Sequence, residues 1–209
     1  MSISSSAPGF SGNASGTRWR TRDIVVTAII GVTFGVVFWS WGLAWNGPFE
    51  VIDATAPVLK DLLYAVWLIP AVLAPLIVRL PGAAIFAELV AAGVSALLGS
   101  TWGVDTLVSG LMQGAGAEVV FAIVRYRNWT FPVLAAAAIG SAAAAWIHDW
   151  VVYYQPVAIE LQLLRGLMMA ISAVVFVAYG STLLVGALRQ AGVLQGFPGG
   201  EAPATSRAG

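Results

Sequence analysis

The chain has 209 residues, of which 59% are hydrophobic and 10% charged, and its mean hydropathy is +0.85. Soluble domains are on average about 25% charged, so this composition indicates a membrane protein. At about 20 residues per crossing, the length allows roughly six membrane helices and leaves no room for a separate soluble catalytic or nucleic-acid-binding domain. With no cysteine and one histidine, the chain cannot build thiolate zinc sites, iron–sulfur clusters or disulfides, and we expect no cofactor or metal.

The two ends of the chain are predicted to lie outside the membrane domain. Residues 1–17 are rich in Ser, Gly and Ala and contain no charged side chain, so we expect a disordered tail. Residues 192–209 are rich in Gly and Pro and are expected to form a flexible C-terminal tail. The segment between them, residues 18–191, is predicted to be an all-α bundle of six transmembrane helices.

Six apolar runs supply these helices. They cover residues 24–44, 62–78, 82–98, 104–124, 132–152 and 165–188. The second run contains Pro70 and Pro75, which predict a kink or a locally opened backbone. The loop between the first two runs contains Asn46, a candidate substrate ligand.

Basic side chains gather on one side of the membrane under this topology. With six crossings both termini lie on that side, together with these eight arginines: Arg18, Arg20, Arg22, Arg79, Arg125, Arg127, Arg189 and Arg207. The positive-inside rule makes this side cytoplasmic. The only lysine, Lys60, falls on the other side, and because no glycine-rich phosphate loop surrounds it, ATP hydrolysis would need a partner.

The opposite, external face is predicted to be acidic and aromatic. It collects Glu50, Asp53, Asp61, Asp105, Asp149, Glu160, Trp39, Trp41, Trp45, Trp67, Trp102, Trp146 and Trp150. One explanation is an interfacial tryptophan belt with ordinary loop carboxylates. The other is a receptor for an organic cation, because carboxylates and aromatic faces together attract a positive charge.

Three polar side chains lie inside the predicted spans. Glu88 is about 15 Å from the outer end of its helix, where a carboxylate is costly unless it faces protein or a cavity. Gln113 is expected at nearly the same depth, so the two either bind one polar substrate group or form a Glu–Gln hydrogen bond between helices. Glu118 lies about 140° around its helix from Gln113 and is the weaker ligand candidate, with a helix contact as the alternative.

Two pairs of residues are expected to face substrate from the outer helix ends. Tyr64 and Trp67 share a face of the second helix, and Trp146 and Asp149 share a face of the fifth. His148 is not expected to form a catalytic dyad with Asp149, because neighbouring helical residues diverge by about 100°. We therefore predict no enzyme activity.

The first helix carries a stripe of small residues, Thr27, Gly31 and Gly35, spaced four apart. Such a stripe lets another helix approach closely. Its partner is either a second protein or another helix of this chain, and spacing alone does not decide between them.

Four short motifs resemble those of one known family. They are Tyr64-Ala65-Val66-Trp67, Pro81-Gly82-Ala83-Ala84 followed by Glu88, Gln113-Gly114-Ala115-Gly116-Ala117-Glu118, and Gly192-Val193-Leu194. Over nearly the whole membrane region the chain resembles the YkoE-like substrate-binding (S) components of energy-coupling factor (ECF) vitamin transporters. That family is associated with thiamine and its hydroxymethylpyrimidine (HMP) precursor.

The resemblance implies a six-helix subunit, without cofactor, in a prokaryotic plasma membrane. It implies that vitamin is captured from outside beneath a lid formed by the first external loop. It also implies a membrane scaffold subunit with two attached ATPases, whose ATP hydrolysis reorients the S component to release vitamin inside. In such families small residues on the first helix, often alanines four apart, dock on the scaffold, a role that would fall here to Gly31 and Gly35.

Two other functions stay open from the residues alone. In a small membrane scaffold or assembly protein, Glu88, Gln113 and Glu118 would only hold helices together, and ligand binding would distinguish this case. A stand-alone ion-coupled carrier would transport without ATPases and respond to a proton or sodium gradient. The sequence does not separate thiamine from HMP as the preferred ligand.

Overall fold

The computed structural model describes residues 18–200, which form helices and connecting turns with no β-strand in this range. The expected tails at residues 1–17 and 201–209 lie outside the described residues. The elements are α1 (Thr21–Trp45), α2 (Glu50–Thr55), α3 (Pro57–Lys60), η1 (Asp61–Leu68), α4 (Ile69–Val78), α5 (Ala83–Leu97), α6 (Asp105–Ile123), α7 (Phe131–Val152), α8 (Ile159–Ser172), η2 (Ala173–Tyr179), α9 (Gly180–Gln190) and η3 (Pro198–Gly200). The segments η1 and η3 are 3-10 helices, and η2 is π-helical.

Five helical stretches are long and apolar enough to cross a membrane. They are Thr21–Trp45, Pro57–Val78, Asp105–Ile123, Phe131–Val152 and Ile159–Gln190. The sixth predicted span corresponds to α5, which is apolar but only 15 residues long, or about 22 Å at 1.5 Å per residue. The all-helical, multi-pass membrane class is therefore confirmed, while one of the predicted crossings is shorter than a typical bilayer-spanning helix.

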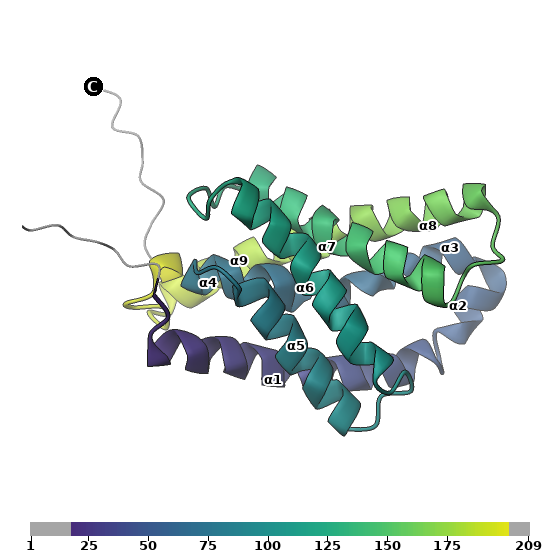
Figure 1. Cartoon of the computed structure of the whole chain (residues 1–209), viewed down its shortest axis with the longest axis horizontal. Helices are drawn as coiled ribbons and strands as arrows, with labels where there is room; N and C mark the ends of the chain where they lie inside the picture. Colours follow the sequence, from purple (N-terminus) through teal and green to yellow (C-terminus); the bar gives the residue numbers. More distant parts are fainter. Residues whose placement is uncertain (1–17, 201–209) are drawn as a thin grey trace, which may run out of the picture.

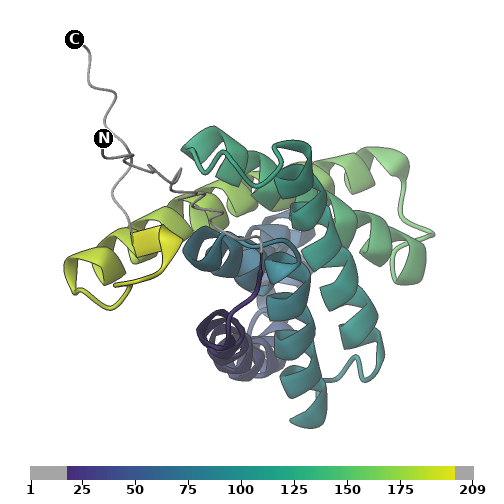
Figure 2. The ribbon, with the colours of Figure 1, turned by 60° about the vertical axis from the view of Figure 1, so that its left-hand side comes forward.

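The helix α4 forms the centre of the bundle. Every residue from Pro70 to Val78 is buried, because α4 contacts α1, α5, α7 and α9 on its different sides. In Figure 1, α1 runs along one side of the molecule, and α7 and α8 lie on the opposite side. Figure 2 shows α1 nearly end-on, with the central helices between it and α8. An element with no polar face fits this position.

The backbone of the second span changes type in its middle. The 3-10 helix η1 ends at Leu68, α4 begins at Ile69, and Pro70 occupies its second position. Proline suits the first turn of a helix because that turn has no internal partner for its N–H groups. The backbone therefore changes from a 3-10 to an α-helix next to Pro70, and α4 continues past Pro75.

The last span is longer than predicted and is also irregular. It runs from Ile159 to Gln190, with the π-helical segment η2 joining α8 to α9. The predicted limits were residues 165 and 188, and the apolar pattern did not predict the π-helix. A π-helical turn requires one extra residue per turn, and apolar periodicity over so short a segment does not reveal it.

The small-residue stripe of α1 is used for packing inside this chain. Thr27, Gly31 and Gly35 are all buried, and α1 packs extensively against α5. A β-carbon on Gly31 would lie 2.6 Å from Cβ of Val90 and 2.9 Å from the backbone oxygen of Ala87. The stripe therefore faces a neighbouring helix of the same chain, which supports the internal-packing alternative. The docking role of Gly31 and Gly35 stays a prediction.

The segment that follows the last span also packs against the bundle. Leu194 is 4% exposed, and the Arg189 side chain donates a hydrogen bond to the backbone oxygen of Gly199. A β-carbon on Gly199 would lie 2.6 Å from the backbone oxygen of Leu76, so the segment approaches α4 closely. Of the flexible tail predicted at residues 192–209, the described part, residues 192–200, packs against the bundle, with Leu194 buried.

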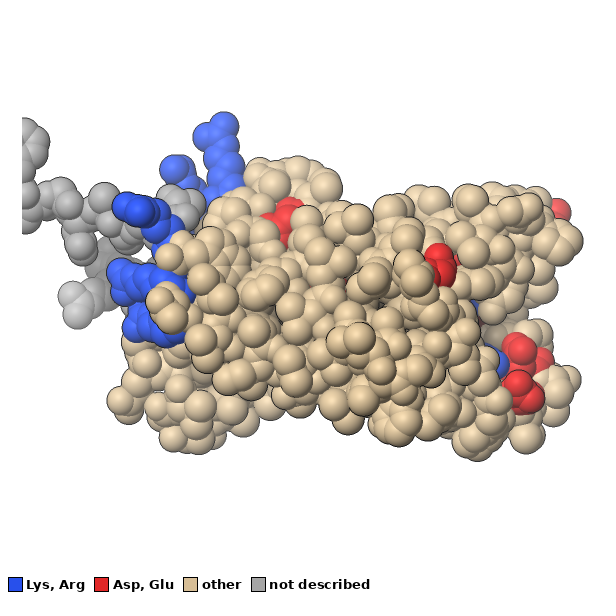
Figure 3. Space-filling view, turned by 60° about the horizontal axis from the view of Figure 1, so that its bottom comes forward, with Lys and Arg blue, Asp and Glu red and all other residues tan. Residues whose placement is uncertain are grey.

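Charged side chains separate toward the two ends of the molecule. Figure 3 shows Lys and Arg gathered mainly at one end of the visible face, and most of the visible Asp and Glu toward the other. The end that carries the first and last described residues is the basic one. This separation agrees with the sequence-based division into a basic and an acidic face.

Candidate functional site

A cavity of about 260 Å³ lies at the acidic end of the bundle. Its aromatic lining is Phe38, Trp45, Tyr64, Trp67, Trp102, Tyr153 and Tyr154. Its charged lining is Glu50, Asp53, Lys60, Asp105 and Asp149. The short helices α2 and α3 contribute to one wall, and α6 supplies the polar residues Ser109 and Gln113. Aromatic walls with a few convergent polar groups are typical of a small-molecule site.

The aromatic rings of the cavity contact one another edge to face. The Trp45 ring centre lies 4.9 Å from that of Trp67 and 6.0 Å from that of Tyr64, and Trp67 lies 5.6 Å from Trp102. Such pairs contribute roughly 0.5–1.5 kcal/mol each beyond their burial. The wall is therefore ordered before any ligand enters.

The 3-10 geometry of η1 aligns two of the predicted site residues. In a 3-10 helix, residues three apart eclipse each other, and Tyr64 and Trp67 both point into the cavity with ring centres 5.2 Å apart. The predicted shared face is confirmed. Their contact with a ligand stays a prediction.

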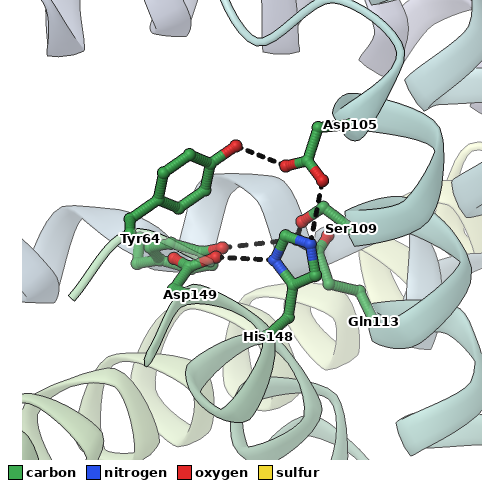
Figure 4. Close-up of polar contacts among 7 residues, drawn as sticks. Tyr64, Asp105, Ser109, Gln113, His148 and Asp149 are labelled. Atoms are coloured by element: carbon green, nitrogen blue, oxygen red, sulfur yellow. Dashed lines mark hydrogen bonds and ion pairs between the residues drawn. The ribbon is translucent and has the colours of Figure 1, made fainter. Parts of the chain in front are cut away.

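The Gln113 amide is held at the cavity wall by side-chain partners. Its nitrogen donates to Oγ of Ser109 at 2.8 Å and lies 3.5 Å from the Tyr64 hydroxyl. Figure 4 shows these groups converging with Asp149 and His148. Since no described backbone group holds this amide, its hydrogen bonds can be shared with a ligand.

The His148 ring joins two of the cavity carboxylates. Its Nδ1 lies 3.0 Å from Oδ1 of Asp149, and its Nε2 lies 3.2 Å from Oδ1 of Asp105 (Figure 4). Asp105 also accepts a hydrogen bond from the Tyr153 hydroxyl. Burial raises the pKa of Tyr153, and the hydrogen bond to Asp105 raises it further. The expectation that His148 and Asp149 diverge is wrong, because the His148 ring contacts the carboxylate of Asp149 directly.

Glu88 lies outside the cavity lining and contacts backbone. It is fully buried, and its Oε1 accepts a hydrogen bond of 2.9 Å from the amide of Ala71 in the first turn of α4. A carboxylate at a helix N-terminus satisfies an otherwise unpaired N–H and is favoured by the helix dipole. Glu88 and Gln113 thus have separate partners, and neither the expected shared pocket nor the expected direct bond between them occurs.

Glu118 lies toward the basic end and has a similar role. It accepts hydrogen bonds from the backbone amides of Gly82 at 2.6 Å and Ala84 at 3.0 Å, and from the Tyr126 hydroxyl at 2.7 Å. Burial and this last bond raise the pKa of Tyr126, so its hydroxyl stays a donor. Glu118 therefore holds the start of α5 in place. Of the two alternatives for this residue, the structure supports the contact between helices.

Of the last two predicted site residues, Asn46 lines the cavity and Trp146 does not. The amide of Asn46 donates to the Gly42 oxygen and to Oγ1 of Thr101, both at 3.0 Å. Trp146 turns away from the cavity, and its Nε1 donates to the backbone oxygen of Gln162 at 2.9 Å. A spacing of three still leaves about 60° between side chains, enough to direct Asp149 into the cavity and Trp146 onto α8.

Several cavity residues were not predicted from the sequence as ligand candidates. They include Phe38, Trp45, Lys60, Trp102, Asp105, Ser109, Tyr153 and Tyr154. Trp45, Trp102 and Asp105 already stood in the predicted acidic and aromatic face, so membership of that face was the available signal. Within residues 18–200, no group of three or more His, Asp or Glu side chains is arranged to hold a metal ion.

Comparison with known proteins identifies the family. A family model described as "ABC-type cobalt transport system, permease component" matches residues 22–144. The Bacillus subtilis (strain 168) protein YkoE, whose name describes an HMP/thiamine permease, is 37% identical over 134 residues, which are 63% of this chain and 64% of that protein. The chain thus spans somewhat less than two thirds of this relative's length.

A solved structure agrees with that assignment. The chain matches the "Crystal structure of an S-component of ECF transporter" with a TM-score of 0.81 and 31% identity, over 87% of this chain and 91% of that one. Its apolar helices and this fold make it a multi-pass plasma membrane protein. The chain belongs to the family of transport permease components that the matching model describes, as a YkoE-like member with the fold of an ECF-transporter S component.

Proposed function

We propose that this protein is the vitamin-binding S component of an ECF uptake system, and that it captures thiamine or HMP in the cavity at its acidic end. The observation that carries the proposal is the lining of that cavity, which combines an aromatic wall with several carboxylates. The relative with a permease name and the S-component fold support the same assignment.

The chemistry of thiamine matches this lining. Its thiazolium ring carries a permanent positive charge, which aromatic faces and carboxylates attract. Its aminopyrimidine ring donates and accepts hydrogen bonds, for which Gln113 and Tyr64 are suited. HMP contains only the pyrimidine part, so it would use the second set of contacts without the first.

The proposed ligand contacts are therefore a subset of the sequence-predicted ones, with two additions. Tyr64, Trp67, Gln113, Asp149 and Asn46 are retained because they line the cavity. Trp45 and Asp105 are added on the same ground. We assign Glu88, Glu118 and Trp146 to holding helices together, since each of them bonds to backbone.

In this proposal the chain crosses the membrane six times, with α5 as the short crossing and both termini in the cytoplasm. The basic end then faces the cytoplasm, as the positive-inside rule requires, and the cavity faces outward. A membrane scaffold subunit and two ATPases would supply the energy for reorientation and vitamin release. The chain has no enzymatic step of its own in this mechanism.

Titration of the purified protein tests the proposal. Trp45, Trp67 and Trp102 line the cavity, so thiamine and HMP should change the intrinsic tryptophan fluorescence in a saturable way. Riboflavin, a vitamin of different shape, is the control and should leave it unchanged at the same concentration. Absence of saturable binding by both thiamine and HMP would contradict the proposal and favour a scaffold role.

A further inference from the structure

One cation of the protein itself lies in the acidic cavity. Lys60, at the end of α3, is the only lysine or arginine in the cavity lining of the described chain. It is 6% exposed. Its Nζ lies 4.7 Å from the ring centre of Trp45 and 3.7 Å from Oδ2 of Asp53. A buried ammonium needs such compensation, because it has lost its water.

These are the same contacts that a cationic ligand requires. An organic cation is held by an aromatic face together with a nearby carboxylate. Trp45 also meets Tyr64 and Trp67 edge to face, so it belongs to the ordered wall against which a ligand would pack. The Lys60 ammonium therefore occupies a position suited to a cation.

A ligand cation could replace Lys60 in its contacts more readily than it could replace Arg165, the other cation of this end that lies over an aromatic ring and beside a carboxylate. The guanidinium carbon of Arg165 lies 3.5 Å from the ring centre of Tyr154, and its Nη2 lies 3.1 Å from Oδ1 of Asp61, a carboxylate that is 1% exposed. In contrast, the Asp53 side chain is 55% exposed on the short helix α2. Lysine is a compact charge on a flexible stem, and its partner can return to water without leaving a buried charge behind.

We propose that Lys60 is a specificity-determining residue: its ammonium occupies the position between Trp45 and Asp53 and must leave it when a cationic ligand binds there. It thereby lowers the affinity for positively charged ligands relative to neutral ones of the same shape. Any small cation that cannot offer further contacts to the cavity is rejected in favour of the attached ammonium. This inference rests on the proposed function and adds a residue that discriminates between charged and neutral ligands.

The test compares two ligands of one shape in three proteins. Thiamine carries the thiazolium charge, and deazathiamine replaces that ring by a neutral thiophene. In Lys60→Met, the ratio of thiamine affinity to deazathiamine affinity should rise roughly tenfold, or about 1.4 kcal/mol, which lies between the values for exposed and for desolvated cation–π contacts. In Lys60→Arg, which keeps the charge, the ratio should stay within about twofold of the wild-type value, a difference of about 0.4 kcal/mol.

The outcomes separate this inference from the proposed function. If wild-type protein binds thiamine but Lys60→Met shows an unchanged or lower ratio, the inference is wrong and the proposed function stands. If wild-type protein binds neither thiamine nor HMP, both are wrong. Arg127→Met removes an exposed positive charge at the basic end and should leave the ratio unchanged. An equal rise in that variant would show a general charge effect and overturn the role of Lys60.

A second measurement needs no substitution. Because Lys60 is the only lysine, reductive methylation with isotope-labelled formaldehyde labels one side chain and keeps its positive charge. The Trp45 ring should shift the Lys60 methyl resonance upfield in the empty protein, and saturating thiamine should move the resonance to an unshifted position. A resonance that keeps its upfield position in the thiamine complex would show that Lys60 stays on Trp45, which would overturn the proposal.

Discussion

Carboxylates at the acidic end and carboxylates in the rest of the bundle have different kinds of partners. In the cavity, Asp53 pairs with Lys60, and Asp149 pairs with His148, so side chains meet side chains. Elsewhere, Glu88 and Glu118 accept hydrogen bonds from backbone amides at the starts of α4 and α5. The same chemical group therefore serves two purposes in one small protein.

The difference lies in what is left behind when a partner is lost. A backbone amide buried without an acceptor costs about 1–3 kcal/mol, and it cannot rotate toward another group. A flexible side chain in the cavity lining, such as Lys60, can turn toward another partner. We therefore expect changes in the interior to affect stability and changes at the cavity to affect affinity.

The largest effect is expected from Glu118→Ala. It removes the acceptor for the amides of Gly82 and Ala84 and for the Tyr126 hydroxyl, which should destabilise the protein by about 3 kcal/mol or more. Thermal unfolding in detergent measures this, and Glu118→Gln, which keeps one acceptor oxygen, should lose less. A normal melting temperature combined with lost thiamine affinity would instead place Glu118 in the site.

A somewhat smaller effect is expected from Gly31→Ala. Its new β-carbon would overlap Val90 and the Ala87 backbone, and overpacking of this kind costs about 1–3 kcal/mol. Gly186→Ala is the matched control, because no atom lies within 4 Å of a β-carbon there. If Gly31→Ala melts normally and binds vitamin, but no longer co-purifies with a scaffold subunit, the stripe docks on that subunit and the packing account is wrong.

At the cavity, Gln113→Leu should reduce affinity and leave stability nearly unchanged. It keeps the approximate shape but removes the amide that bonds to Ser109, and loss of one ligand hydrogen bond should weaken thiamine and HMP binding about tenfold. Gln155→Leu changes an exposed amide at the same end and serves as the control. Equal affinities for the two variants in calorimetry would remove Gln113 from the site.

The smallest effect is expected from Glu88→Gln. The amide oxygen can still accept the bond from Ala71, so thiamine affinity should change less than about threefold, or 0.7 kcal/mol. Titrations with thiamine and HMP measure this. A tenfold loss for thiamine with unchanged HMP affinity would show that Glu88 faces the thiazolium, and it would erase the distinction between the two regions.

Much of the architecture could be predicted from local composition. Apolar runs locate the membrane helices, and the separation of arginines from carboxylates follows from the same runs because they fix which loops share a side. Tyr64 and Trp67 were found together because their spacing of three suits either helix type. These features need only the residues near them in the sequence.

The features that sequence reasoning missed depend on distant partners. The role of Glu88 follows from the start of α4 beside Ala71, which no periodicity in α5 reveals. The direction of the Gly31 stripe depends on which helix packs against it. Lys60 and Trp45 are separated by the whole first loop, so their contact requires the folded path of α2 and α3.

A structure of the protein with thiamine bound tests the central claim most directly. The account predicts ligand density in the cavity, against Trp45, Trp67 and Gln113, with Glu88 still bonded to the amide of Ala71. Ligand density against Glu88 or Glu118, with the cavity at the acidic end unoccupied, would contradict the account.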